Sequence, residues 1–241
     1  MARDLRSAEH LPKRSPSGEA APPEELPRQR RGITPQLHGR YPDHDVLAQT
    51  QHWDAATRSV VLDRVGNVPP IRFFDAAEER ALRAFCDVVL AQDAEPRIPV
   101  LAMVDRRLCD GELDGFRYAD MPPDPETWRQ VARGLDDSAR ERGADDFAAA
   151  DVELQRELVG AFQRGELEWG ELPVKRAFSV VMRMVLAAFY SHPWAWNEIG
   201  FGGPAYPRGY ARMGLGQREW WEGAAAFSTD PVSDVQERGL E

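Results

Sequence analysis

FFDAAEERALRAFCDVVLAQ, residues 73–92, is the stretch of sequence that decides the fold class. Asp75 can cap the first turn of a helix, and Glu78 follows three residues later, which is the spacing of a capping box. The apolar positions that repeat with a helical period are Leu82, Phe85 and Val89. This spacing predicts an amphipathic helix that packs one face against other helices.

Five further segments have helical spacing and lie on both sides of this one. They are residues 45–65, 99–111, 124–143, 151–165 and 174–191. In the segment 124–143 we expect Asp124 to be the cap and Pro125 to occupy the first helical position. The segment 174–191 is apolar on most faces and is expected to be the central helix. Because no stretch alternates as a strand does, the sequence predicts a mainly α domain of about six helices.

Composition divides the 241 residues into three parts. Residues 1–44 hold seven of the nineteen prolines and few large apolar side chains, which predicts a disordered arm. Residues 45–222 are expected to form a single helical domain with a long aromatic, Gly/Pro-rich loop region near its end. Residues 223–241 are expected to form a flexible tail. At 42% hydrophobic content, the chain can bury one medium-sized core.

The charge and the cysteine count exclude several classes of protein. Thirty Lys and Arg against forty Asp and Glu give a net charge of −10, which disfavours a nucleic-acid binder. No apolar run is long enough for membrane insertion, and no apolar segment follows the twin arginines Arg30 and Arg31, so we expect a cytoplasmic chain. Cys86 and Cys109 are expected to be free thiols, although a single bridge between them stays open.

The motifs of catalytic and cofactor sites are missing. There is no strand followed by a glycine-rich phosphate loop, no GxSxG elbow and no histidine spacing suited to a metal. We therefore predict no catalytic, cofactor-binding or metal-binding residue in this chain. Two alternatives stay open: a stand-alone enzyme in which His192 pairs with Glu198 or Asp87, and a general helical protein-binding module.

The segment YSHPWAWNEIGFGGPAYPRGYARMGLGQREWW, residues 190–221, contains four tryptophans and shows almost no secondary-structure period. We refer to it as the aromatic segment. It can be ordered only if its rings pack on the helical domain, on a partner protein, or on both. Planar and rigid side chains dominate interface energetics, so the predicted partner-binding residues are Trp194, Tyr206, Arg208 and Tyr210. Trp196 is expected to be an internal anchor instead.

The aromatic segment also carries a resemblance to a known family. Its block of the form W-x-x-I-G-F-x-G, with the aromatic and proline before it, is similar to the small subunit of gluconate 2-dehydrogenase, the subunit 3 family. The matching residues are Tyr190, Pro193, Trp196, Ile199, Gly200, Phe201 and Gly203. Phe74 through Asp87 and Pro99 through Asp105, with its Val-Asp step, resemble the family's opening pattern, so the likeness covers about residues 70–222.

The resemblance implies a function that the residues alone do not give. It implies a non-catalytic accessory subunit that partners a large flavoprotein dehydrogenase of the glucose-methanol-choline type, often together with a cytochrome c subunit. FAD and the hydride chemistry would belong to that large subunit, and the substrate would be a sugar or polyol. The accessory chain itself is expected to bind no cofactor.

Overall fold

The computed structural model describes residues 41, 44–93, 95–113, 115–212, 214 and 217–224. Within these ranges the chain has only helices and connections, so the prediction of a mainly α fold is confirmed. The helices are η3, a 3-10 helix (Val46–His52), α1 (Ala55–Gly66), α2 (Ala76–Val89), α3 (Val100–Cys109), α4 (Asp124–Glu141), α5 (Val152–Arg164), α6 (Val174–Phe189) and α7 (Pro193–Ile199). Most of the predicted arm and of the tail, residues 1–40, 42–43 and 225–241, lie outside the described residues.

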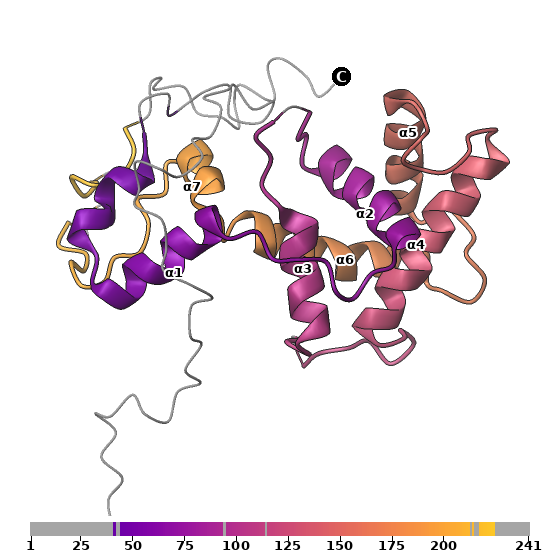
Figure 1. The fold of residues 1–241 in the computed structure, drawn as a ribbon, viewed down its shortest axis with the longest axis horizontal. Helices are drawn as coiled ribbons and strands as arrows, with labels where there is room; N and C mark the ends of the chain where they lie inside the picture. The colour runs from indigo at the N-terminus through magenta and orange to yellow at the C-terminus, as the bar shows by residue number, and fades with distance from the viewer. Residues whose placement is uncertain are drawn as a thin grey trace, which may run out of the picture.

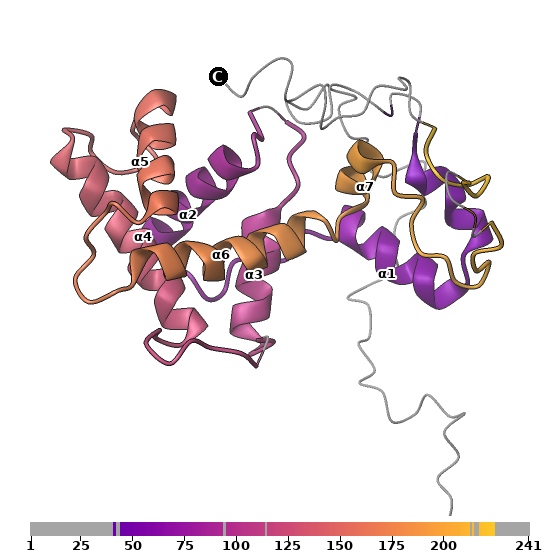
Figure 2. The same cartoon turned by 180° about the vertical axis from the view of Figure 1, so that it is seen from behind.

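Two groups of helices lie side by side along the long axis of the molecule (Figure 1). Helices α2 to α6 form the first group, which we call the bundle. The second group, which we call the terminal lobe, consists of the described residues of 41–66 and 190–224. Helix α6 contacts α3, α4 and α5 and runs across the bundle toward the terminal lobe, as Figure 2 shows from behind. This position agrees with the central role that its apolar sequence predicts.

Helix α2 forms as its sequence predicts. The Asp75 side chain accepts hydrogen bonds from the backbone N–H groups of Ala77 and Glu78, at 2.8 and 2.9 Å. The Glu78 carboxylate accepts one from the backbone of Asp75 at 3.1 Å, which completes the capping box. The buried residues of this helix are Ala81, Leu82, Phe85 and Cys86. The capping box therefore sets the start of α2, and the apolar spacing sets its buried face.

Two helix boundaries differ from the prediction. The segment 45–65 is divided into η3 and α1, because Asp54 starts a new helix by accepting a hydrogen bond from Thr57 N at 2.9 Å. Helix α4 begins at Asp124 itself, with Pro123 at the cap position and no capping side-chain hydrogen bond. Asp124 is therefore the first residue of the helix and not the predicted cap, and its side chain is buried.

Aromatic rings fill the centre of the bundle. The Phe162 ring lies 5.9 Å from Phe85, 4.7 Å from Trp169 and 5.1 Å from Phe178, measured between ring centroids. A side chain at Gly134 would overlap the Trp169 indole, so glycine is needed there for the two to pack. The indole N–H of Trp169 in turn donates to Ser138 Oγ at 3.0 Å.

The terminal lobe joins the two ends of the described chain. The backbone N–H of Val46 donates to Asn197 Oδ1 at 2.8 Å, across 151 residues. Gly203 has a φ of +79°, and its Cα lies close enough to Trp53 that a side chain would overlap that ring. The Tyr41 ring likewise packs so close to Gly200 that a side chain at position 200 would overlap it. Tyr41, one of the residues assigned to the arm, thus packs against the terminal lobe.

The connection between the two groups of helices is bound by one buried carboxylate. Asp105 on α3 is 0% exposed. It accepts hydrogen bonds from the backbone N–H groups of three consecutive residues, Arg72 at 2.8 Å, Phe73 at 2.9 Å and Phe74 at 3.1 Å. Each of its oxygens is thereby paired, which is the condition for burying a charge at tolerable cost. Asp105 thus fixes the path of the chain as it enters α2.

Candidate partner-binding surface

Three large rings of the aromatic segment lie on the outside of the terminal lobe. Tyr206 is 66% exposed, Tyr210 is 50% exposed and Trp220 is 61% exposed. We call these three residues the aromatic surface. Exposed tyrosine and tryptophan rings that gather in one region are typical of protein interfaces, where they are enriched over the rest of the surface.

Trp221 and Arg208 contact two of these rings, Tyr210 and Trp220. Trp221 is 2% exposed, and its ring centroid lies 5.1 Å from that of Tyr210. The Arg208 guanidinium lies 4.2 Å from the Trp221 centroid and 6.0 Å from that of Trp220. On its other side Trp220 makes an edge-on contact with His52 at the end of η3, at 4.9 Å. The aromatic surface therefore rests on a buried tryptophan and on the N-terminal helix.

Arg208, a predicted partner-binding residue, makes several contacts inside the chain. Its guanidinium donates to Gln49 Oε1 at 3.1 Å and to the carbonyl of Pro204 at 3.0 Å. These bonds join the aromatic segment to η3. Substitution of Arg208 is therefore expected to loosen the terminal lobe as well as any interface.

Glu219 closes the loop that carries the aromatic surface. Its side chain is 5% exposed, and it accepts hydrogen bonds from the backbone N–H groups of Ala211 and Arg212, both at 2.5 Å. The bond from Arg212 is the main cause of the lowered pKa of Glu219. These bonds hold Glu219, which precedes Trp220, against the backbone that follows Tyr210.

The structure places Trp194, a predicted partner-binding residue, in the core. Its side chain is 5% exposed and makes an edge-on contact with the His192 ring at 4.8 Å, so it lies in the core and offers almost no surface to a partner. Trp196 is also buried, at 6%, and its indole N–H donates to the carbonyl of Tyr190 at 2.6 Å. Both lie on or beside α7, a seven-residue helix that the sequence did not predict.

The remaining residues of the family block divide between turn and surface. Gly200 and Gly203 have φ values of +68° and +79° and permit the close approach of Tyr41 and Trp53. The partly exposed members of the block are Tyr190, Ile199 and Phe201. Pro193 is the first residue of α7 and is buried. Trp220, by contrast, is an exposed ring that the predicted set of partner-binding residues omits, although it stands in the aromatic segment.

His192 caps α7. It is 1% exposed, and its Nδ1 accepts a hydrogen bond from the backbone of Trp194 at 3.2 Å. Burial lowers the pKa of His192 to about 4; a hydrogen bond to the Arg64 backbone opposes this shift, and the Arg64 charge adds to it. None of the charges that shift this pKa is a carboxylate, and Asp87 is ion-paired with Arg97. The structure therefore gives His192 a capping role and pairs Asp87 with Arg97 instead.

This burial predicts a dependence of stability on pH. His192 is neutral in the folded chain down to a pKa of about 4, whereas an unfolded histidine titrates near 6.5. Protonation of His192 thus favours unfolding. The stabilisation from its neutral, buried form is fully present above pH 6.5. As the pH drops toward 4, the free energy of unfolding falls by about 3 kcal/mol in total. Urea unfolding at pH 7 and at pH 4 measures this change in the free energy of unfolding. The variant His192→Asn keeps a capping oxygen but has no group that titrates in this range. Between pH 7 and pH 4 it should lose about 3 kcal/mol less unfolding free energy than the unchanged chain. Equal losses in the two proteins would contradict the assignment.

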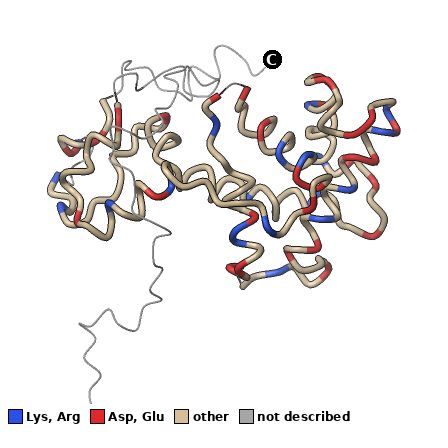
Figure 3. Tube along the Cα trace, viewed as in Figure 1, with Lys and Arg blue, Asp and Glu red and all other residues tan. Residues whose placement is uncertain are grey.

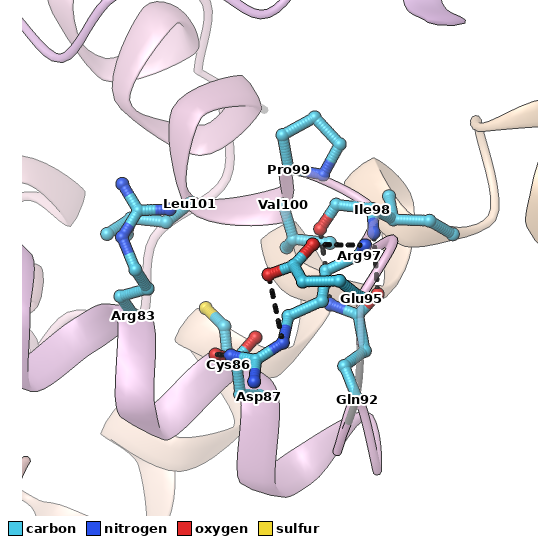
Figure 4. Close-up of a pocket in the computed structure, with 10 residues that line it drawn as sticks. All are labelled: Arg83, Cys86, Asp87, Gln92, Glu95, Arg97, Ile98, Pro99, Val100 and Leu101. Carbon is cyan, nitrogen blue, oxygen red and sulfur yellow. Dashed lines mark hydrogen bonds and ion pairs between the residues drawn. The ribbon is translucent and has the colours of Figure 1, made fainter. Parts of the chain in front are cut away.

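A cavity of about 160 Å³ lies between the end of α2 and the start of α3 (Figure 4). The polar groups that line it are largely satisfied by one another: Arg97 pairs with Asp87, and the Gln92 amide bonds both the N–H and the carbonyl of Ile98. Cys86 also lines the cavity, and burial raises the pKa of its thiol. Cys86 and Cys109 are both free, so they do not form the bridge that the sequence left open.

The described residues form neither a metal-binding cluster nor a membrane-spanning helix. No group of three or more His, Cys, Asp or Glu side chains among them is placed to hold a metal ion. None of the described helices combines the length and the apolar character needed to cross a bilayer.

Comparison with known proteins identifies the family. No curated protein and no solved structure matches the chain. The family model described as gluconate 2-dehydrogenase subunit 3 matches residues 76–203, just over half of the sequence. The match runs from the first turn of α2 to Gly203, so it includes the bundle, α7 and the block that carries the resemblance. The chain belongs to the gluconate 2-dehydrogenase subunit 3 family.

Proposed function

We propose that this chain is a non-catalytic accessory subunit that binds and stabilises a large flavin-dependent dehydrogenase of the glucose-methanol-choline type. The family is named as a subunit of gluconate 2-dehydrogenase, which implies partner subunits. In this proposal the large subunit holds FAD and oxidises a sugar or polyol. A cytochrome c subunit is the further partner that the family resemblance suggests.

The observation that carries the proposal is the aromatic surface. Tyr206, Tyr210 and Trp220 are each at least half exposed, although burial of such rings is worth several kcal/mol in total. They stand on a loop whose shape is set by Glu219 and by buried Trp221. An apolar and exposed surface gains free energy when another protein covers it.

Co-expression with the large flavoprotein subunit tests the proposal. The tagged chain is expected to co-purify with that subunit, and the complex is expected to show bound-flavin absorbance. The chain purified alone should be colourless and should not oxidise sugars with an artificial electron acceptor. Stoichiometric flavin on the isolated chain, or failure to capture the large subunit, would refute the proposed function.

A further inference from the structure

The aromatic surface stands in a locally cationic region of an acidic protein. Residues 204–222 contain three arginines and two glutamates, a formal charge of +1, whereas the whole chain carries −10. Glu219 is buried and binds backbone N–H groups, and the Glu222 carboxylate accepts a hydrogen bond from the backbone of Glu219 at 2.7 Å, so both carboxylates are partly neutralised within the chain. The exposed face therefore carries more positive charge than its composition alone suggests.

The three arginines in question are Arg208, Arg212 and Arg218. The Arg212 guanidinium donates to the carbonyl of Arg218 at 3.3 Å, and that of Arg218 donates to the carbonyl of Gly223 at 3.0 Å. Arg208 binds Gln49 and backbone carbonyls, as described above. Within the described part of the chain, none of the three forms an ion pair with a carboxylate.

Many arginines of the bundle, by contrast, form ion pairs with carboxylates. Acidic and basic residues are interspersed along its helices (Figure 3), and many of them pair. Examples are the pairs Arg83 with Glu79, Arg140 with Asp137, and Arg164 with Glu166. The positive charge beside the aromatic surface thus contrasts with a bundle in which charges of both signs neutralise each other.

We propose that the aromatic surface binds an acidic, partly apolar surface of the large subunit. In this arrangement Arg212 and Arg218 face carboxylates of the partner, while Tyr210 and Trp220 pack into apolar hollows between them. The inference rests on the proposed function and adds the chemistry of the partner's binding site. Complementary charge would steer the two proteins together and select the orientation, and the rings would supply most of the affinity.

Charge reversal tests this inference directly. The double variant Arg212→Glu/Arg218→Glu should bind the co-purified flavoprotein subunit about 100-fold more weakly than the unchanged chain, measured by surface binding at low salt. Trp220→Ala should bind about thirtyfold more weakly. Affinity of the unchanged chain should fall as salt rises, and that of the double variant should change little.

A matched control and a folding control accompany these measurements. Arg156→Glu makes the same change of charge at an exposed position of α5, in the bundle, and should leave the affinity within about twofold. Circular dichroism should show unchanged helical content for the double variant, because both arginines are exposed. Arg212→Gln/Arg218→Gln, which removes charge without reversing it, should weaken binding by an intermediate factor.

The possible outcomes separate the inference from the proposed function. Capture of the large subunit with equal affinity by the unchanged chain and the double variant would overturn this inference alone. Failure of the unchanged chain to capture it would overturn both. A dimer of the isolated chain that the double variant dissociates would assign the surface to a second copy. If deletion of residues 225–241, which carry four acidic side chains, abolishes the effect of charge reversal, the occupant is the chain's own tail.

Discussion

Replacement of Trp194 by alanine is expected to lower the free energy of unfolding by about 4 kcal/mol. The indole is 5% exposed and packs edge-on against His192 at the junction of α6 and α7. Its removal would leave a large cavity in the core that joins the bundle to the terminal lobe. Urea unfolding at neutral pH, followed by circular dichroism, measures the change.

Tyr210→Ala provides the matched control for this prediction. Its ring is also aromatic and lies in the same segment, but it is 50% exposed, so the expected change in unfolding free energy is below about 1 kcal/mol. A Trp194→Ala chain that is as stable as Tyr210→Ala would show that Trp194 is not part of the core. The sequence had favoured the opposite result, a loss of partner binding without a loss of stability.

Replacement of Asp105 by alanine is expected to cost about 4 kcal/mol of unfolding free energy as well. The carboxylate is 0% exposed, and its removal would leave the backbone N–H groups of Arg72, Phe73 and Phe74 without their acceptors. Asp105→Asn keeps one acceptor oxygen in the same place and should cost about half as much. The melting temperatures of both variants measure the two effects.

Asp110→Ala is the control for the Asp105 variants. Asp110 lies at the end of the same helix and pairs with Arg72 at 2.8 Å, but both side chains are more than 40% exposed. Exposed pairs of this kind contribute little, so the expected loss is below about 1 kcal/mol. Equal losses for Asp105→Ala and Asp110→Ala would mean that burial of the carboxylate does not matter.

Local sequence was sufficient to predict the helices of the bundle. In α2 the capping box and the apolar spacing act within a single helix, so Asp75, Glu78 and the buried face could all be read in advance. The break between η3 and α1 was missed because Asp54 lies inside a continuous helical pattern and its capping bond depends on the path of the chain. Helix α7 was missed because seven residues in a ring-rich segment give no period to detect.

The exposure of each ring in the aromatic segment could not be predicted in this way. Trp194 and Trp220 occur in the same aromatic segment, yet one is 5% and the other 61% exposed. The N-terminal residues Val46 and Trp53 pack against this segment, at Asn197 and Gly203, from about 150 positions away, and local sequence does not show contacts of this range. The role of Asp105 was hidden for the same reason. The Val-Asp step was visible in the sequence, but its three acceptor bonds reach residues more than 30 positions earlier.

Hydrogen–deuterium exchange of the chain, free and in complex with the large flavoprotein subunit, tests the central claim most directly. The account predicts that binding slows exchange in residues 206–221, which carry the aromatic surface, and leaves α5 unchanged. Helix α5 is the appropriate reference because it lies at the opposite end of the molecule from the terminal lobe (Figure 1). Slower exchange confined to α4 and α5, with residues 206–221 unaffected, would place the interface on the bundle and contradict the account.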